Sequence, residues 1–125
     1  MTKALPIQNR VTAMTGTDYP IIQAPMGWIA RAQLASAVSN AGGMGVIETA
    51  SGEFDNIRNE VAKMRDLTDK PFGMNVALSY VKGTDIIDFV IEQNIKFVTT
   101  SSGSPNVCTQ AFQEAGINVF HVVPT

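Results

Sequence analysis

The sequence alternates short apolar runs with helical patterns, and this regular alternation constrains the fold more than any single motif does. The apolar runs are rich in β-branched residues and lie at residues 21–23, 44–47, 72–76, 97–99 and 119–123. Amphipathic helical patterns occupy residues 31–42, 54–68, 83–94 and 104–116 between them. Strands that are separated by a helix pair in parallel through right-handed crossovers, so the order βαβαβαβαβ predicts a parallel α/β fold.

Two of the helical patterns carry signals for where the helix begins. In the segment 54–68, apolar residues recur with the helical period, and Asp55 is predicted as the N-cap. In the segment 104–116, Ser104 precedes Pro105, which suits the first helical position, and Gly116 is predicted to end the helix.

The spacing of the repeats points to one kind of parallel fold. The first strand starts near Ile21 and the fifth near Asn118, which gives about 24 residues per βα unit, the repeat of a (β/α)8 barrel. We therefore predict residues 1–19 as an N-terminal lead-in and residues 20–125 as the N-terminal part of a TIM barrel, with about five strands and four helices. A flavodoxin-like doubly wound sheet is the alternative, because it fits the same elements. Polar Asn75 and His121 within strand patterns favour the barrel, whose strand ends face a ligand.

Composition and charge exclude several classes of function. The 125 residues are 45% hydrophobic and 16% charged, with a net charge of −2 and no basic run, which argues against nucleic acid and anionic membrane surfaces. The N-terminus lacks the apolar core of a signal peptide, and no apolar run is long enough to span a bilayer. A lone cysteine, Cys108, cannot form an intramolecular disulfide, so a cytoplasmic protein is expected. One histidine without a cysteine cluster predicts no metal site.

Residues that follow the predicted strands are the candidates for function, because parallel α/β folds bind ligands at the carboxyl ends of their strands. They are residues 23–28, 48–52, Asn75, 99–103 and 121–125. This set contains no paired carboxylates and no Ser/His/Asp order, but it is rich in small residues, hydroxyls and one carboxamide. Such a lining suits a flat, hydrogen-bonding cofactor whose own chemistry does the work. For Asn75, a satisfied polar residue at a strand end is an equal alternative, and a lone histidine such as His121 is more often packed than catalytic.

Five blocks of the sequence, taken in order, resemble a known family. They are "YPIIQAPMGWIA", "LASAVSNAGGMGVI", "LTDKPFGMNVAL", "IKFVTTSSGSP" and "FQEAGINVFHVVPT", which run from Tyr19 to Thr125. Together they resemble the N-terminal part of the nitronate monooxygenase family, also called 2-nitropropane dioxygenases, which is related to FMN-dependent enoyl-acyl carrier protein reductases. The resemblance implies a TIM barrel that binds FMN non-covalently.

The resemblance also implies roles for particular residues. On the cofactor side it implies backbone contacts from the segment Ala24, Pro25 and Met26, a hydrogen bond from Asn75, and an approach of residues 99–103, with Thr100 and Ser101 as the binding residues. On the substrate side we expect Gly27, Trp28, Glu48 and His121. The family's catalytic histidine lies in a glycine-rich motif after the sixth strand, beyond Thr125. His121 lacks the flanking glycines, so that role is not transferred to it and the catalytic residue stays unassigned.

The predicted function is therefore that of an FMN-dependent oxidoreductase that oxidises alkyl nitronates with O2, with this chain as its incomplete N-terminal portion. The first alternative is an NAD(P)H-dependent enoyl-acyl carrier protein reductase. An alternative of another class is a non-catalytic half-barrel that assembles with another copy or with a missing half. We expect a small-molecule substrate, with NAD(P)H as a candidate reductant, and exposed barrel edges that favour a homo-oligomer.

Overall fold

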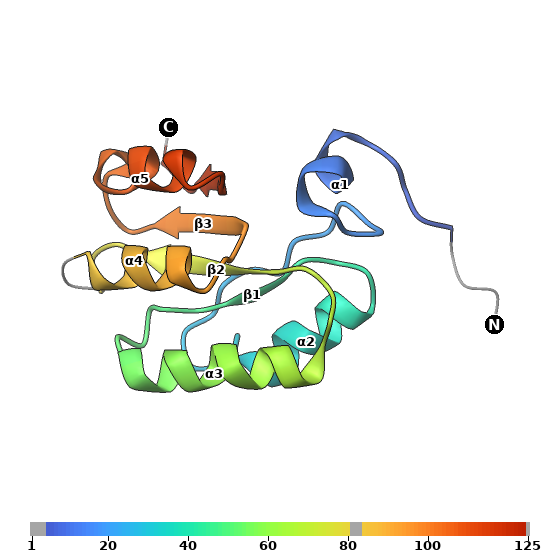
Figure 1. The fold of residues 1–125 in the computed structure, drawn as a ribbon, viewed down its shortest axis with the longest axis horizontal. Coiled ribbons are helices and arrows are strands. Elements are labelled where there is room, and N and C mark those ends of the chain that lie inside the picture. Colours follow the sequence, from blue (N-terminus) through green and yellow to red (C-terminus); the bar gives the residue numbers. More distant parts are fainter. Residues whose placement is uncertain (1–4, 81–83, 125) are drawn as a thin grey trace.

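Four parallel strands form the sheet at the centre of this computed structural model, which describes residues 5–80 and 84–124 (Figure 1). The strands are β1 (Gly45–Ile47), β2 (Phe72–Ala77), β3 (Phe97–Ser101) and β4 (Asn118–His121). They lie in the order β1-β2-β3-β4, so each strand pairs with the next one along the chain. The register places Asn75 beside Thr99 and Thr100 beside His121.

Helices make the crossovers, close to the predicted positions. They are α2 (Ala32–Asn40), α3 (Phe54–Leu67), α4 (Asp85–Glu92), and a 3-10 turn η1 (Pro105–Val107) followed by α5 (Thr109–Glu114). The start at Ser104 and Pro105 is confirmed, because the Ser104 side chain accepts a hydrogen bond from the Asn106 N–H. Of the predicted segment 83–94, Gly83 lies outside the described residues. Within the described ranges, no helix is long and apolar enough to cross a bilayer.

The predicted cap of α3 is wrong by two residues. The N-cap is Glu53, and Asp55 lies inside the first turn, where its charge suits the helix dipole. Glu53 makes no side-chain capping bond, because its carboxylate accepts hydrogen bonds from Arg31 and Asn56 instead.

The first predicted strand, at residues 21–23, is reduced to a single bridge between Ile22 and Met44. Gln23 N–H donates to Met44 O at 3.0 Å, and Met44 N–H donates to Ile21 O at 2.8 Å. The next bond in a parallel ladder would come from the N–H of residue 25, which is a proline and has none. The first predicted strand therefore does not continue past Gln23.

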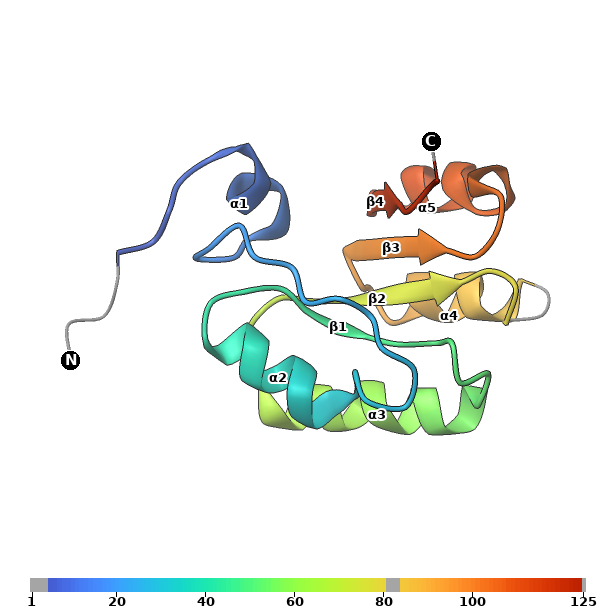
Figure 2. The ribbon, with the colours of Figure 1, turned by 180° about the vertical axis from the view of Figure 1, so that it is seen from behind.

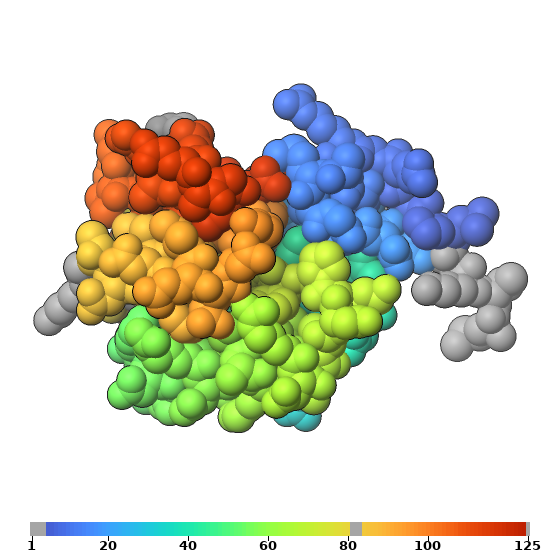
Figure 3. All heavy atoms as spheres, viewed as in Figure 1, coloured from blue at the N-terminus to red at the C-terminus, as the bar shows by residue number. Residues whose placement is uncertain are grey.

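The lead-in contains a helix that the sequence analysis did not predict, α1 (Arg10–Thr15). Asn9 and Thr12 cap it reciprocally, at 3.0 Å in both directions. The Asn118 side chain donates to Met14 O at 3.0 Å, so α1 is fastened to the start of β4. Figures 1 and 3 show the blue lead-in beside the amino ends of the strands and adjoining the red C-terminal unit, which leaves the carboxyl ends free of it.

The two faces of the sheet are packed differently, and this excludes the doubly wound alternative. The larger core cluster joins strand residues Ile47, Met74, Val76 and Val98 to side chains of α2, α3, α4 and α5. The alternate strand residues Met44, Val46 and Phe97 form a second cluster with Phe120, which contains no helix residue from the described part of the chain. Helices thus cover one face only, the outer face, as in a barrel (Figures 1 and 2). A doubly wound sheet has helices on both faces.

Candidate functional site

Loops that are distant in sequence meet at the carboxyl ends of the strands. Glu48 N–H donates to Ala30 O at 2.9 Å, and a Cβ placed on Gly27 would lie 3.7 Å from that of Ala50. We call residues 24–30 the first loop and residues 48–53 the second loop. On the next strands, Leu78 N–H donates to Ser101 O at 2.9 Å and the Ser79 hydroxyl donates to Ser102 O. The loops therefore form one continuous rim.

A polar trio lies on the inner face of the sheet, the face without helices. Asn75 alternates with Met74 and Val76, which face the helices, so its side chain points inward beside its register partner Thr99. Asn75 Nδ2 donates to Thr99 Oγ1 at 2.9 Å and to Thr99 O at 3.3 Å. The Ser101 hydroxyl donates to Asn75 Oδ1 at 3.3 Å. Both ends of the buried amide are thus oriented by β3, and Oδ1 keeps a second lone pair for another donor.

Thr100 and His121 lie on the other face, which corrects the expectation that they line a ligand site. Both are on the helix-covered face, where Thr100 Oγ1 lies 2.6 Å from His121 Nδ1 and Thr109 Oγ1 lies 3.0 Å from His121 Nε2. The Thr109 hydroxyl gives its hydrogen to Pro105 O, so it accepts from Nε2–H, and the Thr100 hydroxyl then donates to Nδ1. His121 is a packed residue that joins β3, β4 and α5.

Glu48 does not present its carboxylate to the rim as expected. Its side chain is 1% exposed, and Oε1 pairs with Arg31 Nε at 3.4 Å while Oε2 accepts from the Ser51 N–H at 2.9 Å. A second ion pair joins Arg31 to Glu53 at 3.1 Å. Hydrogen bonds from Asn56 and Arg31 hold the pKa of the Glu53 carboxyl below its usual value.

The first loop exposes backbone donors. Met26 O accepts from the N–H groups of Ile29 and Ala30, which closes a turn. Within the described residues, the N–H groups of Met26, Gly27 and Trp28 have no acceptor. Ala24 and Met26 are exposed, Pro25 is half-buried, and Trp28 adopts a left-handed backbone with φ of 68°. A run of free N–H groups is a ready binding surface for carbonyl or phosphate oxygens.

One hydroxyl in the second loop is buried without a partner. The Oγ atom of Ser51 is inaccessible to solvent and makes no hydrogen bond to any residue that the structure describes. Buried polar atoms are almost always paired, so an unpaired one at a rim of loops is an observation in favour of a bound polar group.

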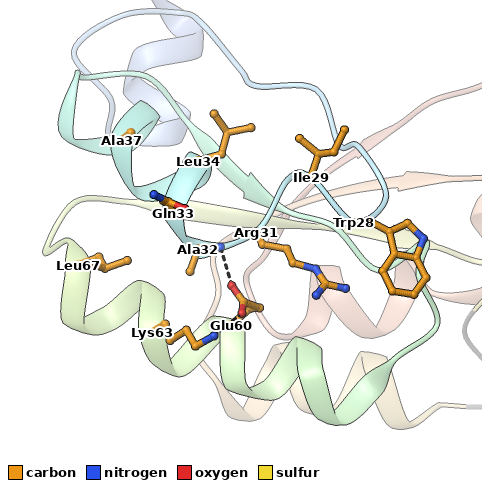
Figure 4. A pocket seen from close by; sticks show the side chains of 10 residues that line it. All are labelled: Trp28, Ile29, Arg31, Ala32, Gln33, Leu34, Ala37, Glu60, Lys63 and Leu67. Atoms are coloured by element: carbon orange, nitrogen blue, oxygen red, sulfur yellow. Dashed lines mark hydrogen bonds and ion pairs between the residues drawn. The ribbon is translucent and has the colours of Figure 1, made fainter.

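An open groove adjoins the first loop on the outside of the molecule (Figure 4). It runs between α2 and α3, and in Figure 4 the Arg31 guanidinium points toward the Trp28 ring. Glu60 accepts from the Ala32 N–H at 2.9 Å and pairs with Lys63 at 2.7 Å. The groove does not contain Asn75, so it is separate from the inner-face trio.

The single cysteine, Cys108, lies apart from the rim of loops, between η1 and α5. Its thiol is buried, and burial raises the pKa of that thiol above its usual value. A raised pKa leaves little thiolate, so Cys108 is a poor nucleophile.

Three residues without an individually predicted role hold the site in place. Gln23 and Thr99 lie within the candidate segments 23–28 and 99–103, and Arg31 lies outside all of the candidate segments. The role of Thr99 can be recognised only from its pairing with Asn75. Both faces of β3 are buried, so its sequence lacks the alternating pattern that would show which side chains face inward. Arg31 lies 17 positions from Glu48, and no local pattern predicts that contact.

Over residues 8–122 the sequence matches the family model described as nitronate monooxygenase. The chain belongs to the nitronate monooxygenase family. The match spans nearly all of the described residues, so the resemblance carried by the five blocks is confirmed.

The curated relatives of this chain include a Mycobacterium tuberculosis enzyme. Its name is (3aS,4S,5R,7aS)-5-hydroxy-7a-methyl-1-oxo-octahydro-1H-indene-4-carboxyl-CoA dehydrogenase. The two are 29% identical over 110 residues, which cover 88% of this chain and 31% of that protein. The nitronate monooxygenase of Paraburkholderia phytofirmans is 46% identical over 63 residues, which cover 50% of this chain and 17% of the relative. The chain thus spans about a third or less of the length of these relatives.

Solved structures agree on the fold. A FabK variant from Thermotoga maritima superposes with a TM-score of 0.89 at 34% identity, covering 95% of this chain and 40% of that one. Nitroalkane oxidase from Streptomyces ansochromogenes gives 0.74 at 24% identity, covering 90% and 42%, and shows likeness of fold alone. This chain therefore matches part of a larger barrel fold, which confirms the prediction made from the spacing of its βα repeats.

Proposed function

We propose that this chain is the N-terminal, flavin-seating portion of an FMN-dependent oxidoreductase that oxidises alkyl nitronates with O2. Membership of the nitronate monooxygenase family supports the reaction class. The structural observation that carries the proposal is the position of Asn75, which is buried on the inner face in the carboxyl half of β2 and oriented by Thr99 and Ser101.

The residues present fit FMN. The free N–H groups of residues 26–28 suit the carbonyl oxygens of the ring or the phosphate, Asn75 Oδ1 suits a ring N–H or a ribityl hydroxyl, and the unpaired Ser51 hydroxyl suits a polar group between the loops. FMN supplies the two-electron oxidation when it is bound. The role of this chain is to bind the cofactor, to orient it and to exclude water from one side. The acid–base residue is expected in the part of the family barrel that follows the sixth strand.

A second candidate is the NAD(P)H-dependent enoyl-acyl carrier protein reductase activity that the resemblance implies. The 34% identity to FabK over 95% of this chain supports it, and so does the relative that acts on a CoA thioester. We keep the nitronate reaction first because the family model bears that name, and so does the Paraburkholderia phytofirmans relative that is 46% identical over 63 residues.

The decisive experiment uses the complete protein that contains this segment. We expect visible absorption of bound oxidised flavin, which an alkyl nitronate bleaches without oxygen and which returns when O2 is admitted. Bleaching by NADH or NADPH together with turnover of an enoyl thioester, without a response to nitronate, would favour the second candidate. A colourless protein that takes up no FMN would overturn both. We further propose a cytoplasmic location and a small-molecule substrate, in line with the composition.

A further inference from the structure

We infer that Arg31 is a positioning residue that holds the first and second loops together as one rigid wall of the proposed flavin site. The inference deepens the proposed function and rests on it. Arg31 itself is not placed against the cofactor. It acts through Glu48, Glu53 and Trp28, which belong to the two loops that it joins.

The contacts of Arg31 reach both loops at once. Its Nε atom lies 3.4 Å from Glu48 Oε1 and its NH2 atom lies 3.1 Å from Glu53 Oε2, both in the second loop. The guanidinium carbon lies 5.2 Å from the centroid of the Trp28 ring in the first loop, within the range of a cation–π contact. Figure 4 shows the guanidinium reaching from the start of α2 toward that ring. These carboxylates raise the pKa of the Arg31 guanidinium, and the largest cause is the hydrogen bond that Arg31 donates to Glu53.

Glu48 makes Arg31 hard to replace. The carboxylate is buried, and its second oxygen accepts from the Ser51 N–H at 2.9 Å, so the turn of the second loop depends on it. The Glu48 N–H in turn donates to Ala30 O in the first loop. A buried carboxylate needs a partner of opposite charge, and Arg31 is the cation that this structure places against it.

Trp28 needs a restraint because its backbone is left-handed, with φ of 68°. A bulky residue in that region is strained and persists only when its surroundings hold it. The contact with Arg31 supplies such a hold. The neighbouring N–H groups of residues 26–28 are those that we assign to the flavin, so the orientation of Trp28 also sets the direction of the donors.

The helix gives Arg31 no other reason to be there. Arg31 is the N-cap of α2 but makes no side-chain capping bond, and a cation is unfavourable at the positive end of a helix dipole. The orphan N–H of Ala32 is satisfied by Glu60 from α3 instead. The position therefore gains from arginine only through the loops.

The test compares three variants in the complete protein. The double variant Arg31→Met/Glu48→Gln removes the clamp without leaving a buried charge, and Arg31→Lys keeps the charge but lacks the fork that serves two carboxylates. Lys63→Met is the control. Lys63 lines the same groove as Arg31, but its ion pair is with Glu60 on α3 and not with either loop. FMN affinity is measured by fluorescence titration and apoprotein stability by thermal unfolding. Any tryptophan elsewhere in the complete protein is replaced by phenylalanine, so that Trp28 is the only one left. The fluorescence anisotropy of Trp28 then reports how ordered the first loop is.

We expect the double variant to bind FMN about tenfold more weakly, because a loosened loop must be ordered on binding. The fluorescence anisotropy of Trp28 should also fall in the double variant. For both affinity and anisotropy, Arg31→Lys should lie between the double variant and the wild type, and Lys63→Met should match the wild type. Unchanged affinity and anisotropy in the double variant would overturn the inference, as would an equal loss in Lys63→Met.

A milder variant keeps the inference testable if the double variant melts early. Glu53→Gln weakens only the half-exposed arm of the clamp, and it should lower Trp28 anisotropy while leaving the Glu48 pair intact. Unchanged anisotropy in Glu53→Gln would then count against the clamp. A wild-type protein that binds no FMN would overturn the proposed function, whereas the anisotropy comparison would still decide on Arg31.

Discussion

The side-chain amide of Gln23 pairs both backbone groups of Val46, beside a ladder that Pro25 cannot continue because it has no N–H. Gln23 Nε2 donates to Val46 O at 3.1 Å, and Val46 N–H donates to Gln23 Oε1 at 3.4 Å. Both Val46 groups are buried at the edge of β1, where an unpaired backbone group is costly. Gln23 therefore lets the chain leave the sheet at Pro25 without orphaning its neighbour.

Gln23→Leu should destabilise the protein by about 1–3 kcal/mol, because it leaves the Val46 N–H and C=O buried and unpaired. Urea unfolding of the variant beside the wild type measures the difference. Gln33→Leu, an exposed substitution on α2, is the control and should change the free energy of unfolding little. Equal stabilities for Gln23→Leu and the wild type would contradict the role given to this amide.

Thr99 and Thr100 are adjacent in sequence but serve opposite faces of the sheet. Thr99 Oγ1 accepts from Asn75 on the inner face, and Thr100 Oγ1 contacts His121 on the outer face. A valine at position 99 therefore tests cofactor binding, and a valine at position 100 tests stability.

We expect Thr99→Val to weaken FMN binding by about fivefold to tenfold, since it removes a partner that orients the Asn75 amide. Thr100→Val should leave FMN affinity unchanged and lower stability by about 1 kcal/mol, because His121 loses its donor. Fluorescence titration and thermal unfolding of both variants in the complete protein provide the comparison. The reverse pattern would show that the two faces are wrongly assigned.

At the scale of the elements, small residues let α2 lie directly on β1. A Cβ on Gly45 would lie 2.0 Å from Ala35 O, a distance that no side chain tolerates. Ser39 strengthens the contact, since its hydroxyl donates to Pro71 O at 2.8 Å and accepts from the Gly45 N–H at 3.2 Å. Ala35 and Ser39 on α2 therefore form the surface that packs against Gly45 of the strand.

Gly45→Ala should destabilise the protein by about 2 kcal/mol or more, because α2 must move away from β1. Gly27→Ala is the matched control for stability, since its Cβ would meet Ala50 at an ordinary 3.7 Å. Thermal unfolding of both variants tests the packing. A Gly45→Ala protein that melts with the wild type would show that the helix is held less closely than described.

At the scale of the whole molecule, the sheet has two open edges with exposed apolar side chains. Ile21 is 63% exposed at the edge beside β1, and Val122 is 62% exposed just beyond β4. Unpaired strand edges and apolar surfaces favour association. In the larger folds that this chain matches, it accounts for 40% of FabK and 31% of the curated dehydrogenase.

Residues 1–125 on their own should not retain FMN tightly, because we expect a segment that matches 40% of FabK to supply only part of the proposed cofactor seat. The isolated segment is expected to elute from size exclusion as an associated species, and Ile21→Lys with Val122→Lys should reduce that association. Absorbance of the eluted protein and its apparent mass test both expectations. A clean monomer would argue against association through the edges, and a yellow, stoichiometric flavin complex would show that the seat is complete.

The sequence by itself determined the order of elements and the family. Alternating apolar runs and helical patterns located β1 to β4 and α2 to α5, because hydrophobic periodicity and caps such as Ser104 are local properties of the chain. The five matching blocks identified the relationship that the family model bears out. The short helix α1 was missed because six residues without an apolar stripe give a weak signal.

Only the tertiary structure decided which face each strand residue occupies. Thr99 faces inward and Thr100 outward, and β3 is buried on both faces, so its sequence shows no alternation to tell them apart. Pairing register placed His121 against α5, and the missing N–H of Pro25 ended the first strand. The pair between Arg31 and Glu48 exists only because two crossover loops fold onto each other, and no local pattern predicts a contact made in that way.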